Sequence, residues 1–255
     1  MRQVYEWEVQ LALSGPISVA KPLRLEVEKG RSRPFATTVA IKKHQDGITV
    51  ELTVRASNQT EANGAAVSFI GQMVDLLCLW IDLPLHLSFY GNRFKPLEDH
   101  TRRLIDHEEW SSAFRLSREY SIARPSLTRA LSWFRKGITS EDPIDKLLAL
   151  WSALEGIGAK HARPSQRTAK GAINQICDCF EQLWGDKSHW KIISEDAEFI
   201  NLVHEKRSGI SHGFITADLD TFLELSDVLP RLRDLTQSFL FDWEKSDNLG
   251  YRAAA

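Results

Sequence analysis

The chain has 255 residues, of which 43% are hydrophobic and 26% are charged, and its formal net charge is -2. This composition is typical of a globular protein and allows one large domain or two modest ones. It excludes binding of nucleic acid through an overall basic surface, so such binding would need a local basic patch or one completed by a second subunit.

Neither a leader peptide nor a membrane span is predicted. The N-terminal stretch MRQVYEWEVQ lacks the apolar core of a signal peptide. The longest apolar run, VDLLCLWIDLPL, is too short to span a bilayer and contains Asp75 and Asp82. Cys78, Cys177 and Cys179 form neither a disulfide framework nor a zinc-type pair of pairs, so we expect free thiols in the interior. A cytoplasmic protein without membrane contact follows as the expectation.

Residues 1–95 are predicted to form a small α+β domain. The stretches VYEWEVQLAL, TTVAIKK and ITVELTV predict strands, and the last two form a hairpin with Asp46-Gly47 at its turn. Apolar residues recur at helical spacing over 59–80, which predicts one helix packed on the sheet. A further strand, LHLSFYG, is expected after Pro84.

From residue 110 onward the pattern predicts helices almost throughout. The candidate helices are 108–120, 124–137, 142–157, 168–184, 195–210 and 218–243, with breaks at Pro125, Gly137, Pro143, Gly158, Pro164, Gly185 and Gly213. Long helices joined by short loops are typical of a helical bundle. The expected organisation is an α+β domain at 1–95, a linker at 96–109, an all-α bundle at 110–247 and a tail at 248–255.

A carboxylate lies on the apolar stripe of the segment DPIDKLLALWSALEGIG. Asp142 can cap this helix, and Pro143 suits its first turn. Glu155 follows Trp151 by four residues and so projects from the apolar stripe. A buried charge needs a partner, so we expect either a cation from another helix or, near the helix end, contact with solvent.

The segment SEDAEFINLVHEKRSGI contains a matching cation. Ser194 can cap this helix, and Arg207 projects from the apolar face formed by Ile200 and Val203. An ion pair between Arg207 and Glu155 is therefore expected if the two helices are neighbours.

Arg207 is followed by His212 within the stretch EKRSGISHGF. On a regular helix this offset turns through about 140°, so the two side chains would not share a face. Gly209 and Gly213 predict a distorted or ending helix, which would bring His212 towards the side of the helix that carries Arg207.

The spacing alone is weak evidence, because Arg93 with His100 and Arg102 with His107 show similar separations. Those pairs lie in a charged stretch without an apolar face, and we treat them as chance matches.

The C-terminal half resembles the HEPN (higher eukaryotes and prokaryotes nucleotide-binding) superfamily. The stretches DPIDKLLALWSALEGI and KRSGISHGF carry the likeness, and the second matches the family's R-x(4–6)-H motif with Arg207 and His212. The resemblance covers roughly residues 110–245. It implies a helical bundle that works as a homodimer, with both copies of the motif meeting at the interface.

The resemblance also implies a metal-independent endoribonuclease without a cofactor, of the kind found among toxins and antiviral effectors. His212 would exchange protons with the attacking 2′-hydroxyl or the leaving 5′-oxygen, and Arg207 would bind the scissile phosphate. The candidate catalytic set also includes Glu155 and Ser208. Active members often have Asn, Asp or His at the position of Ser208. The superfamily also contains non-catalytic scaffolds that bind a nucleotide or a protein partner, which is the alternative expectation.

One local basic stretch, AKHARPSQRTAKG, is a candidate RNA-binding segment because it carries no acidic residue. Its basic side chains are Lys160, His161, Arg163, Arg167 and Lys170. The competing interpretation is a solvated loop followed by the start of a helix. The tryptophans are expected in the core or an interface, with base stacking left open for Trp110 and Trp190.

The expected function is therefore RNA cleavage, by a toxin or antiviral defence effector. The N-terminal domain would sense a trigger, restrain the nuclease, or bind an antitoxin or other protein partner. A further alternative is that Arg207 merely neutralises Glu155.

Overall fold

The computed structural model describes residues 4–26, 35–44, 46–89, 101–187, 190, 197–216 and 218–246. The chain has the predicted mixture of α and β structure, with an antiparallel sheet near its N-terminus and mostly helices after it. It divides into two compact units, Met1–Ala123 and Arg124–Ala255. The division lies further along the chain than expected, after a helix that the sequence analysis assigned to the bundle.

The sheet of the first unit has the order β3-β4-β5-β1-β6 and is antiparallel throughout. Its strands are β1 (Tyr5–Ser14), β3 (Leu23–Glu26), β4 (Phe35–His44), β5 (Gly47–Ala56) and β6 (His86–Phe89). The expected hairpin is present, because β4 and β5 pair on either side of Asp46. Alternation along β1 and β5 buries apolar side chains such as Leu11, Val50 and Leu52.

A parallel pair of two-residue strands, β2 (Ile17–Ser18) and β7 (Arg103–Leu104), joins the expected linker to the first unit. Strands this short carry no detectable period, which is why the pattern did not predict them. Residues 96–100 of the expected linker lie outside the described part of the chain.

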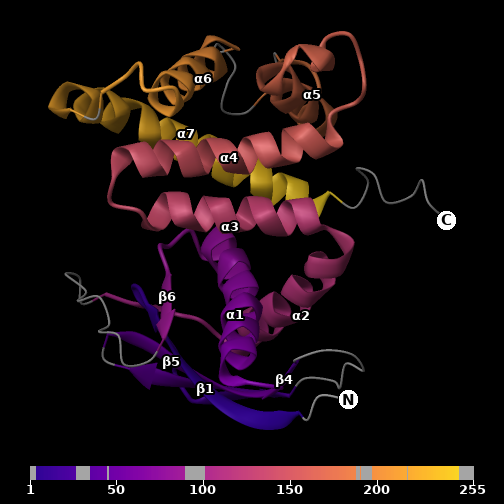
Figure 1. Ribbon diagram of the computed structural model, residues 1–255, viewed down its shortest axis with the longest axis vertical. Coiled ribbons are helices and arrows are strands. Elements are labelled where there is room, and N and C mark those ends of the chain that lie inside the picture. The colour runs from indigo at the N-terminus through magenta and orange to yellow at the C-terminus, as the bar shows by residue number, and fades with distance from the viewer. Residues whose placement is uncertain are drawn as a thin grey trace. The chain divides into compact units, whose positions relative to one another are not determined.

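Helix α1 (Gln59–Ile81) covers the sheet, as predicted (Figure 1). The side chain of Asn58 caps it by accepting from the backbone N–H of Glu61, whose carboxylate accepts from the N–H of Ser57. By length and composition α1 could cross a membrane, but 56% of its most apolar window is buried inside the structure. That burial is the pattern of a core helix in a soluble protein.

Helix α2 (His107–Ala123) packs against α1 rather than within the bundle. The ring of Phe114 meets that of Phe69 edge-on, with 4.9 Å between centroids. The first unit therefore has two helices where one was expected.

In the second unit, the long helix α4 (Pro143–His161) contacts the other helices (Figure 1). These are α3 (Pro125–Thr139), α5 (Ala172–Trp184), α6 (Ala197–Ser211) and α7 (Leu219–Lys245). The start of α4 is as predicted, with Pro143 in the first turn and the Asp142 carboxylate accepting from the N–H of Ile144 at 2.7 Å. The HEPN-like character of this bundle stays a prediction.

Three expected helix boundaries were wrong. Gly137 lies inside α3 rather than ending it, and a Cβ there would lie 2.8 Å from the side chain of Leu150. Gly158 does not end α4; it lets Ile176 of α5 approach, since a Cβ there would lie 3.1 Å from the backbone nitrogen of Ile176. The expected helix 168–184 is interrupted at Gly171, whose φ of 125° separates the short 3-10 helix η1 (Thr168–Lys170) from α5. All three cysteines are buried free thiols, as predicted.

Candidate functional site

The predicted arginine–histidine motif lies at the C-terminal end of α6. His212 occupies the cap position, and Gly213 follows in the left-handed conformation with a φ of 72°. The N–H of Gly213 donates to the carbonyl of Ile210 at 3.1 Å, and that of Phe214 donates to the carbonyl of Gly209 at 2.8 Å. These two bonds form a Schellman motif. The helix therefore ends at this point, as its glycines predicted; the expected cap Ser194 lies outside the described residues.

The expected contact between Arg207 and Glu155 is present. Nη2 of Arg207 lies 3.4 Å from Oε2 of Glu155, which links α6 to α4. The two side chains are 31% and 33% exposed, respectively, so the pair is half-buried rather than enclosed in the core. Water and ligands can therefore reach the guanidinium.

A second pair, missed by the sequence analysis, links the same two helices. The ring of His204 lies 5.4 Å from that of Trp151, one helical turn before the Arg207–Glu155 pair on each helix. The signal that could have found His204 is its position three residues before Arg207, which places both on one face of α6.

His212 is exposed, and its ring centroid lies 6.1 Å from that of Phe214. The carbonyl of Ser208 accepts the backbone N–H of His212 at 3.0 Å. Ser208 itself is half-buried within the last turns of α6. The structure thus brings Arg207 and Glu155 together where α4 meets α6, with Ser208 next to Arg207 along α6 and His212 at the cap of α6.

The basic stretch does not form a row of free cations. The Arg163 guanidinium binds the carboxylate of Asp178 on α5, with Nη2 and Oδ1 2.7 Å apart, and the Arg163 backbone N–H donates to Oδ2 at 2.8 Å. Burial alone would raise the pKa of Asp178, but these bonds from Arg163 and one from Gln182 outweigh it and hold the pKa below 3.8. Arg163 therefore connects the α4–α5 loop to α5.

Arg167 and His161 also have partners within the protein. Arg167 pairs with Glu181 at 2.8 Å, and Nε2 of His161 lies 2.7 Å from the hydroxyl of Ser126. Burial, with the nearby charge of Lys160 adding to it, lowers the pKa of His161. Intramolecular contacts thus occupy three of the five predicted RNA-binding side chains, and the competing interpretation, a loop before a helix, describes the segment better.

Lys160 and Lys170 are exposed, and neither forms an ion pair with another residue in the part of the chain that the structure describes. They are the members of the basic stretch that remain available for phosphate groups.

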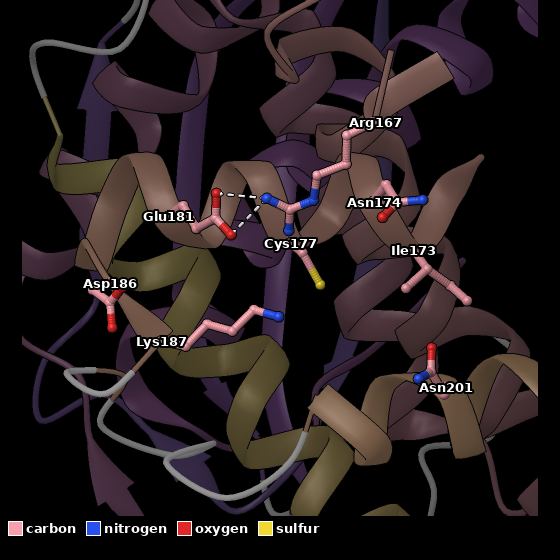
Figure 2. Close-up of a pocket in the computed structure, with 8 residues that line it drawn as sticks. All are labelled: Arg167, Ile173, Asn174, Cys177, Glu181, Asp186, Lys187 and Asn201. Carbon is pink, nitrogen blue, oxygen red and sulfur yellow. Dashed lines mark hydrogen bonds and ion pairs between the residues drawn. The ribbon is translucent and has the colours of Figure 1, made fainter. Parts of the chain in front are cut away.

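An open pocket of about 520 Å³ lies beside α5 (Figure 2). It is bordered by the Arg167–Glu181 pair and by Asn201 of α6, and Cys177 lines it. Burial raises the pKa of the Cys177 thiol, which keeps the sulfur protonated and a poor nucleophile. Neither Arg207 nor His212 lines this pocket.

Burial settles the expectation for two of the tryptophans. Trp110 and Trp190 are 0% and 2% exposed, so the suggestion that they stack on bases was wrong. Of the two arginine–histidine spacings treated as chance matches, Arg102 with His107 lies in the first unit. There the Arg102 guanidinium donates to the carbonyl of His44 at 3.3 Å. The other, Arg93 with His100, lies outside the described residues.

No protein-family model, curated protein or solved structure matches this chain. Likewise, the described residues contain no group of three or more His, Cys, Asp or Glu side chains that could hold a metal ion.

Proposed function

We propose that the chain is a metal-independent endoribonuclease of the HEPN type, with Arg207 and His212 as its reacting residues. The observation that carries this proposal is the Arg207–Glu155 pair at the junction of α4 and α6, a few residues before an exposed histidine at the helix cap. Arg207 reaches solvent from a defined position, and His212 is accessible to a substrate.

Glu155 positions Arg207 for phosphate. A guanidinium carries five N–H donors in a planar fork, and the described contact with Glu155 engages one of them. The remaining donors can bind two phosphate oxygens and stabilise the charge that grows on them in the transition state.

His212 accepts and donates the protons in the proposed reaction. In the proposed reaction the ribose 2′-oxygen forms a bond to phosphorus and gives its proton to an imidazole nitrogen. The bond from phosphorus to the 5′-oxygen breaks, and that oxygen takes a proton as it leaves. The products are a 2′,3′-cyclic phosphate and a 5′-hydroxyl. One imidazole serves as base and a second as acid, so the proposed enzyme is a homodimer that brings two His212 side chains together.

Ser208 follows the motif arginine. Its half-buried position in α6 gives it a supporting role in holding the helix end rather than a role in proton transfer. The first unit would restrain the nuclease or bind a partner such as an antitoxin, in keeping with a toxin or antiviral effector.

A second candidate function is a non-catalytic scaffold. It is favoured by the pairing of Arg207 with Glu155 and by the intramolecular partners of Arg163, Arg167 and His161. In that case Arg207 would act only within the protein.

The deciding experiment is cleavage of a fluorescent RNA in EDTA by wild type and by His212→Ala. We expect His212→Ala to lose cleavage while keeping its melting temperature and oligomeric mass. His107→Ala is the matched control, because exposed His107 has the same spacing from Arg102 but belongs to the first unit. RNA left uncut by wild type, or cut equally by His212→Ala, contradicts the proposal and favours the scaffold.

A further inference from the structure

Phe214 is an exposed aromatic ring fixed next to the proposed catalytic histidine. Its side chain is 85% exposed, and the neighbouring Ser211, His212 and Gly213 are also exposed. A large apolar side chain that is this exposed gains no stabilising free energy from burial. Its exposed position therefore needs a physical explanation.

The helix end accounts for the outward position of the ring. In a Schellman motif the residue at the position of Phe214 often makes an apolar contact with the residue at the position of Gly209. Here that space belongs to Ile215, since a Cβ at Gly209 would lie 2.5 Å from Cδ1 of Ile215. Ile215 seals the helix end, and the Phe214 ring is left free of the core.

The backbone nevertheless holds Phe214 in place. Its N–H donates to the carbonyl of Gly209 at 2.8 Å, and its ring is tilted by 40° to that of His212 with 6.1 Å between centroids. That separation is comparable with the distance from the phosphate to the base within one nucleotide. A nucleotide whose ribose and phosphate contact His212 would therefore bring its base over Phe214.

We propose that Phe214 is a stacking platform for one unpaired base of the bound RNA. This rests on the proposed function for the roles of His212 and Arg207. Stacking suits the site because every base presents a flat face, whereas a base in a duplex is already stacked and paired. The site would therefore favour unpaired RNA over a duplex and would accept many base sequences.

The test measures RNA binding rather than cleavage. The probe is a fluorescein-labelled, fully 2′-O-methylated oligonucleotide of mixed sequence, which lacks the nucleophile and stays intact. Binding is followed by fluorescence anisotropy for wild type, Phe214→Ala and Phe214→Trp. Ile122→Ala is the matched control, because Ile122 is 86% exposed and lies in the other compact unit. The oligomeric mass of each variant is also measured by light scattering.

We expect Phe214→Ala to bind the single strand roughly tenfold more weakly, while Phe214→Trp and Ile122→Ala bind like wild type. Annealing the probe to its complement, or removing its bases, should abolish the difference between wild type and Phe214→Ala. These results stand whether or not wild type cleaves RNA, so they separate this inference from the proposed function.

Three outcomes overturn the inference. Equal binding by wild type and Phe214→Ala rules out stacking, and so does an absence of RNA binding by wild type. A changed oligomeric mass in Phe214→Ala would instead assign the exposed ring to contact with a second copy of the chain.

Discussion

The ion pair between Arg207 and Glu155 should contribute little to stability, because both side chains are partly exposed. Exposed pairs contribute about 0–1 kcal/mol, because solvent screens the charges and the long side chains lose conformational freedom. The N–O distance is 3.4 Å and about a third of each side chain is exposed, so the contribution of this pair lies at the low end of that energy range. Its effect is to restrict the Arg207 side chain to one region above α4.

Arg207→Ala should therefore lower the free energy of unfolding by less than about 1 kcal/mol and still abolish RNA cleavage. Chemical denaturation and the RNA assay measure the two effects separately. Lys206→Ala is the control on the same helix, because Lys206 pairs with Glu224 at 2.6 Å and should lose a similar amount of stability without losing cleavage. A loss of several kcal/mol from Arg207→Ala would show that its role is structural.

At the scale of elements, the loop between α4 and α5 is held by its own arginines. Asp178 is buried on α5 and accepts bonds from the backbone and the guanidinium of Arg163, while Arg167 binds Glu181 one turn later. A buried carboxylate needs these donors, because desolvation of an unpaired charge is costly. The segment that looked like a phosphate-binding row is therefore a connection between two helices.

This connection should make the protein sensitive to acid. The folded pKa of Asp178 lies below its ordinary value of 3.8, so the unfolded chain takes up the proton first. The contribution is complete above about pH 4 and is lost as the pH falls from there through the folded pKa. Asp178→Asn should unfold at lower denaturant concentration at pH 6 and lose less stability on acidification than wild type.

Asp227→Asn is the control for that experiment, because Asp227 is an exposed acid on α7 whose replacement should keep the acid sensitivity of wild type. Equal acid sensitivity in Asp178→Asn and wild type would contradict the role given to Asp178.

At the scale of the whole molecule, the near-neutral chain offers a polyanion few unpaired cations at the candidate site. The net charge is -2, and Arg163 and Arg167 are neutralised by acids of α5. Lys160 and Lys170 form no ion pair among the described residues, and the long contact of Arg207 leaves most of its donors available. These three side chains are the groups of the candidate site that can contact phosphates.

The affinity for single-stranded RNA should consequently depend weakly on salt. Each neutralised phosphate contributes about -0.7 to the slope of log K against log salt, so three phosphates give a slope of roughly -2. Anisotropy titrations over a range of KCl concentrations measure it, and replacing both Lys160 and Lys170 by alanine should reduce the slope by about 1.4. A slope of about -3.5 in wild type, the value for five phosphates, would mean that Arg163 and Arg167 leave their carboxylates to bind RNA.

Local features of this protein follow from the sequence by itself. The hairpin at Asp46-Gly47, the start of α4 at Asp142 and the end of α6 at Gly213 each depend on residues within a few positions of one another. Strand period, side-chain caps and left-handed glycines act over that range, so the pattern of the chain determines them.

Tertiary structure decided which faces meet. It placed α2 on α1 rather than in the second unit, turned Gly158 into a packing contact with Ile176, and brought Glu155 beside Arg207. It also supplied Asp178 as the partner of Arg163, fifteen positions away in the chain. Such pairings depend on how whole helices pack, and the side chains that meet across a helix interface leave no period or spacing in the sequence between them.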